Sequence, residues 1–136
     1  MNFSIERDKL LKPLQQVVGV VERRQTLPVL SNVLMVVEGD TLALTGTDME
    51  VELVARIALD QSYSHGEITV PAKKLLDICK SLPDESRIQF VLDDQKLQIK
   101  AGRSKFSLAT LPANEFPNLE DAVGQVQRLQ AHGVDR

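Results

Sequence analysis

The sequence is short of the residues on which much catalytic and stabilising chemistry depends. Its 136 residues include one cysteine, two histidines, one tyrosine and no tryptophan. The single cysteine, Cys79, excludes an internal disulfide and fits a reducing cytoplasm. With so few large aromatic side chains, a platform for stacking bases is not expected.

Long apolar runs and glycine-rich motifs are also missing. No stretch approaches the roughly 20 apolar residues of a membrane helix, and the N-terminus lacks the basic head and apolar stretch of a secretory signal. The seven glycines are scattered, with none in a GxGxxG or GxxxxGK order. The residues therefore favour a single cytoplasmic domain without a cofactor, and they make an enzyme a poor candidate.

The spacing of apolar residues predicts a strand, a helix and three strands, and then the same order again. The expected helices are Arg7–Val21 and Ala72–Leu82. The expected strands are Asn2–Ile5, Val33–Val37, both arms of a Thr41–Leu59 hairpin, Glu67–Val70, Arg87–Leu92, Lys96–Lys100 and Lys105–Thr110. A turn at 38–40 and a loop at 60–66 make the first set of strands a meander.

The two halves also match in residue type. Leu42, Leu44, Val51 and Leu53 correspond at a constant offset to Leu97, Ile99, Phe106 and Leu108. Gly46 and Gly102 are the expected turn glycines, and the Asp48 side chain is expected to accept backbone hydrogen bonds in the first turn. We therefore predict an α+β fold of two similar halves, with both helices packed on one side of antiparallel sheets.

One acidic run and the two histidines are candidate chemical sites. Asp48, Glu50 and Glu52 stand two apart, so on one strand their carboxylates would share a face. They form either a solvated outer face, which is the favoured interpretation, or the metal site of a hydrolase. His65 and His132 fall in expected loop or tail and are interpreted as surface residues. Cys79 lies on the apolar side of the second expected helix, where a buried, inert thiol is expected.

The distribution of charge is more informative than the net charge of −3. Acidic residues are concentrated in 38–70, whereas 71–106 is basic. If both helices lie on one side of the sheets, basic residues from the helices and the first loop converge into a field that binds phosphate without reading bases. The alternative is ordinary solvated lysines on helix faces. The residues concerned are Lys9, Lys12, Arg23, Arg24, Lys73 and Lys80.

Several segments together resemble the N-terminal domain of the bacterial β sliding clamp, the processivity subunit of DNA polymerase III. They are LLKPL at 10–14, Arg24 with TLPVLSN at 26–32, LALTGTDME at 42–50, VPAKK at 70–74, DIC at 77–79, GRSKF at 102–106 and TLPANEFP at 110–117. The resemblance covers about residues 1–121, and a divergent tail follows at 122–136.

The resemblance implies the DNA-clamp fold, built of two strand-helix-three-strand units. In the family, three such domains per chain and two chains form a ring around duplex DNA, which tethers the polymerase without making or breaking a bond. Lys9, Lys12, Lys73 and Lys80 would then line the hole, and Arg24 matches a loop arginine that touches DNA.

The resemblance also implies a joint with another clamp protomer. Its residues here would be Lys74, Arg103, Lys105 and Phe106, and Lys96 lies on the same expected edge. In the family, the polymerase and clamp loader dock in a groove of domains that this sequence does not contain. We therefore keep two hypotheses: a DNA-binding, non-catalytic clamp domain of the replication machinery, or a clamp-like interaction protein that binds an intact clamp through this edge and alters its ring.

Overall fold

Strands make up most of the molecule, and two helices interrupt them. The computed structural model describes residues 1–21 and 27–117. In chain order the elements are β1 (Asn2–Glu6), α1 (Arg7–Val18), the short 3-10 helix η1 (Pro28–Ser31), β2 (Asn32–Thr47), β3 (Glu52–Pro71), α2 (Ala72–Ser81), β4 (Arg87–Asp93), β5 (Lys96–Ala101), β6 (Ser104–Ala109) and η2 (Ala113–Glu115).

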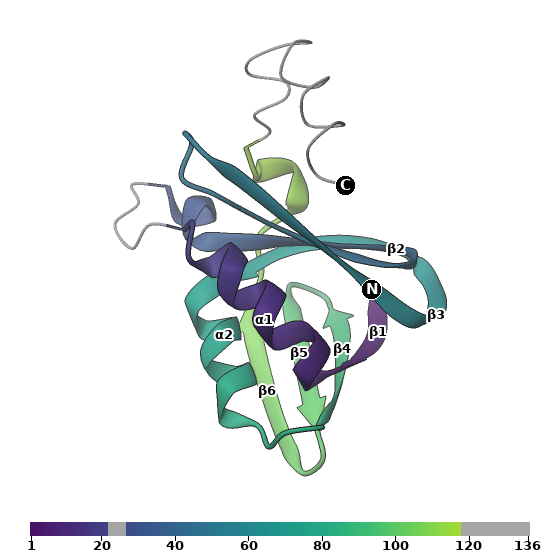
Figure 1. The fold of residues 1–136 in the computed structure, drawn as a ribbon. Helices are drawn as coiled ribbons and strands as arrows, with labels where there is room; N and C mark the ends of the chain where they lie inside the picture. Colours follow the sequence, from purple (N-terminus) through teal and green to yellow (C-terminus); the bar gives the residue numbers. More distant parts are fainter. Residues whose placement is uncertain (22–26, 118–136) are drawn as a thin grey trace.

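The strands form two antiparallel sheets (Figure 1). The four-stranded sheet has the order β1-β4-β5-β6, in which Phe3 pairs with Phe90 and Ile99 pairs with Phe106. The second sheet is the long hairpin of β2 and β3. Within the described residues, β6 has a sheet neighbour on one side only, so its other side is an edge.

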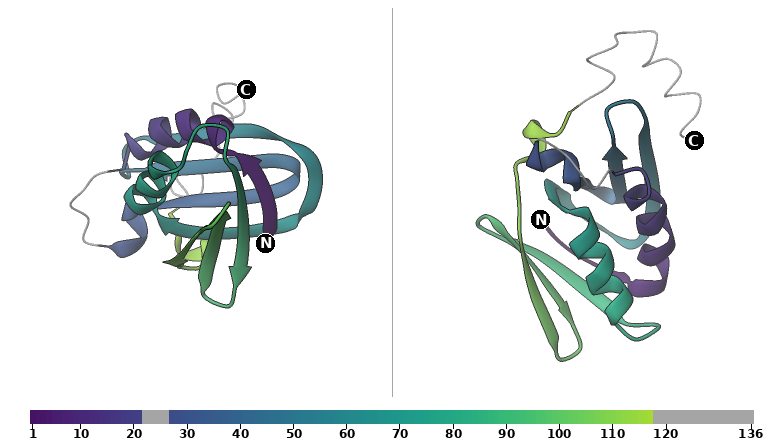
Figure 2. Two further views of the ribbon diagram at one scale, coloured as in Figure 1. Left: turned by 90° about the horizontal axis from the view of Figure 1, so that it is seen from below. Right: turned by 90° about the vertical axis from the view of Figure 1, so that its left-hand side faces the viewer.

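Both helices lie side by side on the same side of the sheets, as the two views of Figure 2 show. Helix α1 contacts β2, β3 and α2, and α2 also contacts β2 and β3. The apolar sides of the helices and the inner faces of both sheets share one core. Its largest fully buried side chains include Phe3, Leu10, Leu14, Leu42, Leu44, Leu75, Ile88, Phe90, Leu97 and Ile99. The prediction of an α+β clamp-like fold with two helices on one side is confirmed.

The predicted meander in the first half is wrong in its pairing. Residues 38–40 do not reverse the chain, and 60–66 are not a loop, because β2 and β3 run through these segments. Val33 therefore pairs with Val70, and Leu42 pairs with Ile57. The register of the hairpin shifts on either side of Gly39, whose φ is +60°. The glycine thus allows an irregularity within a continuing strand rather than a turn.

The predicted constant offset between the halves fails in the second arm of each hairpin. Leu97 faces Leu108, but Leu42 faces Ile57 instead of Leu53. The cause is the different length of the two reversals, which join Thr47 to Glu52 in one half and Ala101 to Ser104 in the other. Helix α1 is followed by the two long strands β2 and β3, and α2 is followed by the three strands β4, β5 and β6. The halves therefore share a helix followed by antiparallel strands, but not a residue-by-residue correspondence.

Gly46 has a different role from the one predicted. Gly102 has a φ of +57° in its turn, but in the first hairpin Met49 has the positive φ, at 79°, and Gly46 lies within β2 opposite Leu53. A Cβ atom on Gly46 would meet both the Cγ1 atom and the carbonyl oxygen of Val17 at 2.8 Å. Gly46 is therefore needed for the close approach of α1 to the hairpin.

The segment that follows β6 packs against η1 and the end of β3. Val29 and Leu30 of η1 form a small buried cluster with Phe116. The backbone of Leu111 exchanges two hydrogen bonds with Thr69, and the Thr69 hydroxyl donates a third to the Leu111 carbonyl at 3.0 Å. The segment after β6 is thus fastened to β3 beside η1.

We predict that Gly46→Ala destabilises the protein by about 1–3 kcal/mol, the usual cost of overpacking a core. The reason is that the added methyl group forces α1 away from β2 at Val17. The free energy of unfolding from urea denaturation is the measurement. Gly102→Asn is the matched control, because asparagine tolerates a positive φ and nothing lies within 4 Å of the added Cβ. Equal stability of Gly46→Ala and the wild type would contradict the close packing.

Candidate nucleic-acid interface

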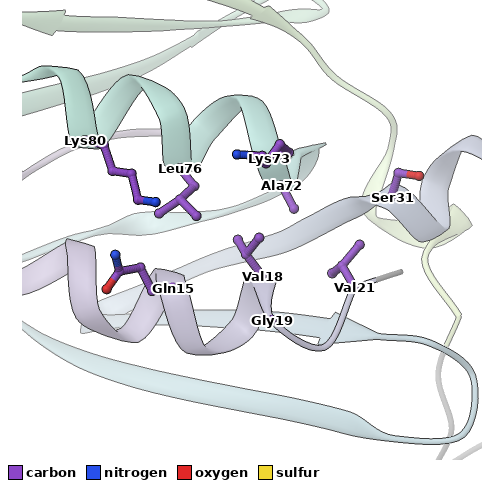
Figure 3. A pocket seen from close by; sticks show the side chains of 9 residues that line it. All are labelled: Gln15, Val18, Gly19, Val21, Ser31, Ala72, Lys73, Leu76 and Lys80. Atoms are coloured by element: carbon purple, nitrogen blue, oxygen red, sulfur yellow. The ribbon is translucent and has the colours of Figure 1, made fainter. Parts of the chain in front are cut away.

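The exposed side of the helix layer contains a groove between α1 and α2 (Figure 3). The groove has a volume of about 810 Å³. Val18 and Leu76 project into it from opposite helices, and Gln15, Lys73 and Lys80 line it with polar groups. The surface therefore combines an apolar floor with a polar rim that carries positive charge.

The helical repeat explains why lysines reach this surface. Leu10, Leu14 and Val17 place one side of α1 in the core at intervals of three and four residues. Lys12 lies on the other side and is exposed. Helix α1 runs through Pro13 without a break and ends at Val18, with Gly19 as its C-cap.

Helix α2 places two lysines along the groove. Ala72, Leu75, Leu76 and Cys79 are its buried residues. Lys73 and Lys80 are seven residues apart, almost two full turns, so they lie on the same flank of the helix and both line the groove. Figure 3 shows the Lys80 side chain directed across the groove toward Gln15.

The predicted basic residues are not equivalent. Lys73 donates a hydrogen bond of 2.9 Å to Asp77 one turn later. Among the described residues, Lys12 and Lys80 have no ion-pair partner. Lys9 is also exposed, but it borders a separate hollow with Asp60. The structure thus brings Lys73 and Lys80 together and leaves Lys9 on the flank of α1 away from α2.

Arg23 and Arg24 lie outside the described residues, so their predicted contribution stays a prediction. Every cation placed at the helix layer by the structure therefore comes from α1 or α2.

Arg7 has a role that the sequence reasoning missed. Its side chain is only 14% exposed. Its Nε donates to the carbonyl oxygen of Cys79 at 3.1 Å, and its Nη1 lies 2.9 Å from Asp84 and 3.1 Å from Asp8. The start of α1 is thus fastened to the end of α2, which fixes the two helices relative to each other. The sequence gives little indication of this contact, because a basic residue at the first position of an amphipathic helix is normally exposed to solvent.

The predicted interface residues gather around the edge strand β6. Arg103 and Lys105 are exposed, and Phe106 is partly buried against the core. Lys105 stands opposite Lys100 of β5, although like charges in that position repel each other. Lys96 is exposed at the start of β5. Lys74 is exposed on α2 and does not line the groove.

The acidic run does not form the shared strand face that the spacing suggested. Asp48 and Glu50 lie in the loop between β2 and β3, and Glu52 begins β3. The Asp48 Oδ1 accepts backbone N–H bonds from Val51 at 2.8 Å and Glu50 at 2.9 Å. These bonds lower the pKa of Asp48, the Val51 bond most. The prediction that Asp48 bonds the turn backbone is confirmed, and its carboxylate has a structural use.

The remaining candidate groups also have ordinary surroundings. The His65 side chain is 55% exposed and lies 3.5 Å from Glu67 and 3.7 Å from Glu38, whereas His132 is outside the described residues. Over the described part of the chain, no three metal-binding side chains come together to hold an ion. In the same part, neither helix has the length and apolar character that crossing a bilayer requires.

Cys79 is fully buried, as predicted. Burial raises the pKa of its thiol to about 12, and the nearby Arg7 charge acts in the opposite direction. Because the thiolate is the reactive form, the group is inert at neutral pH.

Two helices that share one side of antiparallel sheets, each followed by antiparallel strands, are the arrangement of the DNA-clamp class. Residues 1–120 match the family model of the DNA polymerase III beta subunit, N-terminal domain. The chain belongs to this family.

Individual relatives agree with this assignment. The beta sliding clamp of Pseudomonas putida strain KT2440 is 64% identical over 126 residues, and the match covers 93% of this chain and 34% of the relative. A beta sliding clamp from Vibrio harveyi is 54% identical, with 93% and 88% of the two chains covered. A crystal structure of a Pseudomonas aeruginosa DnaN sliding clamp superposes with a TM-score of 0.86 at 66% identity, over 88% of this chain and 32% of that one. The chain thus spans about a third of the Pseudomonas relatives.

The buried thiol makes stability depend on alkaline pH in a predictable direction. A folded-state pKa near 12 exceeds the value of the unfolded chain, so the unfolded state releases the proton first as the pH rises. We expect the contribution of this thiol to the free energy of unfolding to be constant below about pH 8. Between about pH 9 and 12, the free energy of unfolding should fall by up to about 1.4 kcal/mol per pH unit.

Urea denaturation at a series of pH values measures this loss, and Cys79→Ala is the control that removes it. Identical pH profiles for the wild type and Cys79→Ala would show that the thiol titrates normally in the folded protein.

Proposed function

We propose that this chain is a DNA sliding clamp domain whose α1–α2 surface contacts the phosphates of duplex DNA without reading base sequence. The observation that carries the proposal is the common orientation of the two helices. Lys73 and Lys80 of α2 line the groove between them, and Lys12 is exposed on the side of α1 opposite its buried residues. Membership of the beta-subunit family supports it.

The chemistry of this surface suits a sliding contact. Lysine ammonium groups on flexible stems bind phosphate as point charges and do not fix an orientation. Such contacts are sequence-independent and weaken steeply with salt, because binding releases counterions from DNA. A diffuse field of this kind holds DNA while allowing movement along it. Lys9, Arg23 and Arg24 extend the proposed field beyond the groove.

The whole-protein role goes beyond the part of the relatives that this chain spans. We propose that residues 1–121 are one clamp domain and that 122–136 are a separate tail. We further propose that the domain is part of a non-catalytic, cytoplasmic processivity factor of DNA polymerase III. In that role the clamp ring encloses DNA and tethers the polymerase, while the polymerase and clamp loader bind domains other than this one.

The second proposed surface is the joint with another clamp protomer. Within the described residues, edge strand β6 offers a backbone without a sheet partner on one side, the partly buried Phe106, and a concentration of positive charge at Arg103 and Lys105. A partner strand with acidic side chains satisfies all three features. Lys74 and Lys96 extend the proposed contact.

The same edge supports the alternative function of a clamp-like interaction protein. In that case the domain binds a full-length clamp through β6 and alters assembly of the ring. The two functions differ in a measurable way, because a domain that only binds DNA leaves an intact clamp dimer unchanged.

We predict that reversing Lys12, Lys73 and Lys80 together to Glu abolishes binding of the chain to duplex DNA at low salt. The change replaces attraction to phosphate by repulsion at the proposed surface. The measurement is fluorescence anisotropy of a labelled duplex at increasing salt concentrations.

A single matched pair tests the location of that effect. Lys80→Glu should weaken binding several-fold, whereas Lys100→Glu, the same charge change on the outer face of the four-stranded sheet, should have a smaller effect. Similar losses in the two variants would mean that DNA responds to total charge and not to the α1–α2 surface.

We predict that the chain associates with an intact P. putida beta sliding clamp, and that Arg103→Glu with Lys105→Glu prevents the association. The reason is that charge reversal beside β6 repels the acidic partner expected there. Masses from light scattering of the mixture are the measurement, with Lys80→Glu as the control for a charge change elsewhere. An unchanged clamp mass with the wild-type chain would reject the interaction protein.

A further inference from the structure

Each helix of the proposed DNA surface carries one acidic residue, and the two have different surroundings. Asp8 lies in the first turn of α1, where a negative charge is favourable, and Arg7 neutralises it at 3.1 Å. Asp77 lies in the middle of α2, and its partner is Lys73, one of the lysines that line the groove. Asp77 therefore removes positive charge from the surface that is proposed to hold DNA.

The stability of α2 does not explain this ion pair. Asp77 is too far from the N-terminus of the helix to satisfy free backbone N–H groups or to benefit from the helix dipole. The order of the pair, with lysine four residues before the acid, is the less favourable one for a helix. Both side chains are also more than half exposed, at 66% and 57%, so the pair is weak.

The pair does have a direct consequence for phosphate binding. The Lys73 ammonium donates to the Asp77 carboxylate at 2.9 Å, so a DNA phosphate must compete with that carboxylate for the same donor. Lys80, on the same flank of α2, has no such competitor among the described residues. The two groove lysines thus differ in how freely they can bind an anion.

We propose that Asp77 is an intramolecular competitor for phosphate, which keeps the contact of Lys73 with DNA weak and short-lived. This inference rests on the proposed DNA-binding function and adds a regulating residue to it. A contact that exchanges between a carboxylate and successive phosphates favours movement along DNA over fixed attachment. Without Asp77, Lys73 becomes one further full phosphate contact.

The test is the affinity of the chain for a labelled duplex, measured by anisotropy over a range of low salt concentrations. Asp77→Asn should bind several-fold more tightly. The plot of log K against log salt should steepen by about one unit, because each neutralised phosphate contributes about 0.9. Asp94→Asn is the matched control for net charge, since it lies in the β4–β5 turn, far along the chain from both helices, and asparagine tolerates its φ of 60°.

A double-mutant cycle shows whether Asp77 acts through Lys73. In a Lys73→Gln background, Asp77→Asn should give no more gain than Asp94→Asn gives. Asp77→Ser provides a second variant with the same charge change, and thermal melts should show that all the variants are folded.

Two results overturn the inference: equal affinities of Asp77→Asn and Asp94→Asn, or a gain from Asp77→Asn that persists when Lys73 is absent. If either occurs while Lys80→Glu still weakens binding, the proposed function stands and only the role of Asp77 is wrong. If Lys80→Glu binds as the wild type does, the DNA-binding function fails, and the inference fails with it.

Discussion

The arrangement of the molecule depends on burying the apolar sides of both helices in one core. Leu10 and Leu14 of α1 and Leu75 of α2 are fully buried with residues from both sheets. Neither helix can turn its apolar side to the opposite face of the sheets without exposing these residues, each of which is worth about 1.5–3 kcal/mol of burial. The polar sides of the two helices must therefore face solvent on the same side of the molecule, so the lysines on those sides are exposed there.

Two local contacts fix the positions of the helices more closely. Gly46 lets α1 approach β2 more closely than any side chain would permit, and the Arg7 guanidinium links the start of α1 to the end of α2. The groove lies between the two helices that these contacts position, and Val18 and Leu76 project into it. Packing of the core thus controls the geometry of a surface that lies outside it.

The positive charge of the protein is divided between two surfaces with different backbone surroundings. Along the exposed sides of the helices, the backbone groups are hydrogen-bonded within each helix, so flexible side chains are what a partner meets there. On β6, beside Arg103 and Lys105, the backbone has no sheet partner on one side in the part of the chain that the structure describes. The first surface suits a polyanion that moves, and the second suits a protein strand that stays.

Sequence patterns predicted the helices, most of the strand segments and the common side of the helices, because amphipathic periodicity directly reports which face is buried. They failed where pairing depends on distant residues. Gly39 reads as a turn locally, but the pairing of Val33 with Val70 makes it an irregularity in one long strand. The local sequence predicts that Gly46 is a turn residue. Only the position of α1 shows that the residue must lack a side chain because Val17 lies against it. The exposed lysines were predictable from helical spacing, whereas the Lys73–Asp77 pair and the position of Arg7 required side-chain coordinates.

We propose that this chain meets DNA at the exposed side of the α1–α2 layer. Titration of the isotope-labelled chain with a short duplex, followed by two-dimensional NMR, tests it residue by residue. We expect the chemical shifts of amides in α1 and α2 around Gln15, Lys73 and Lys80 to change, and those on the outer face of β4 and β5 to stay the same. Shift changes confined to the sheets, with the helix signals unaffected, would contradict it.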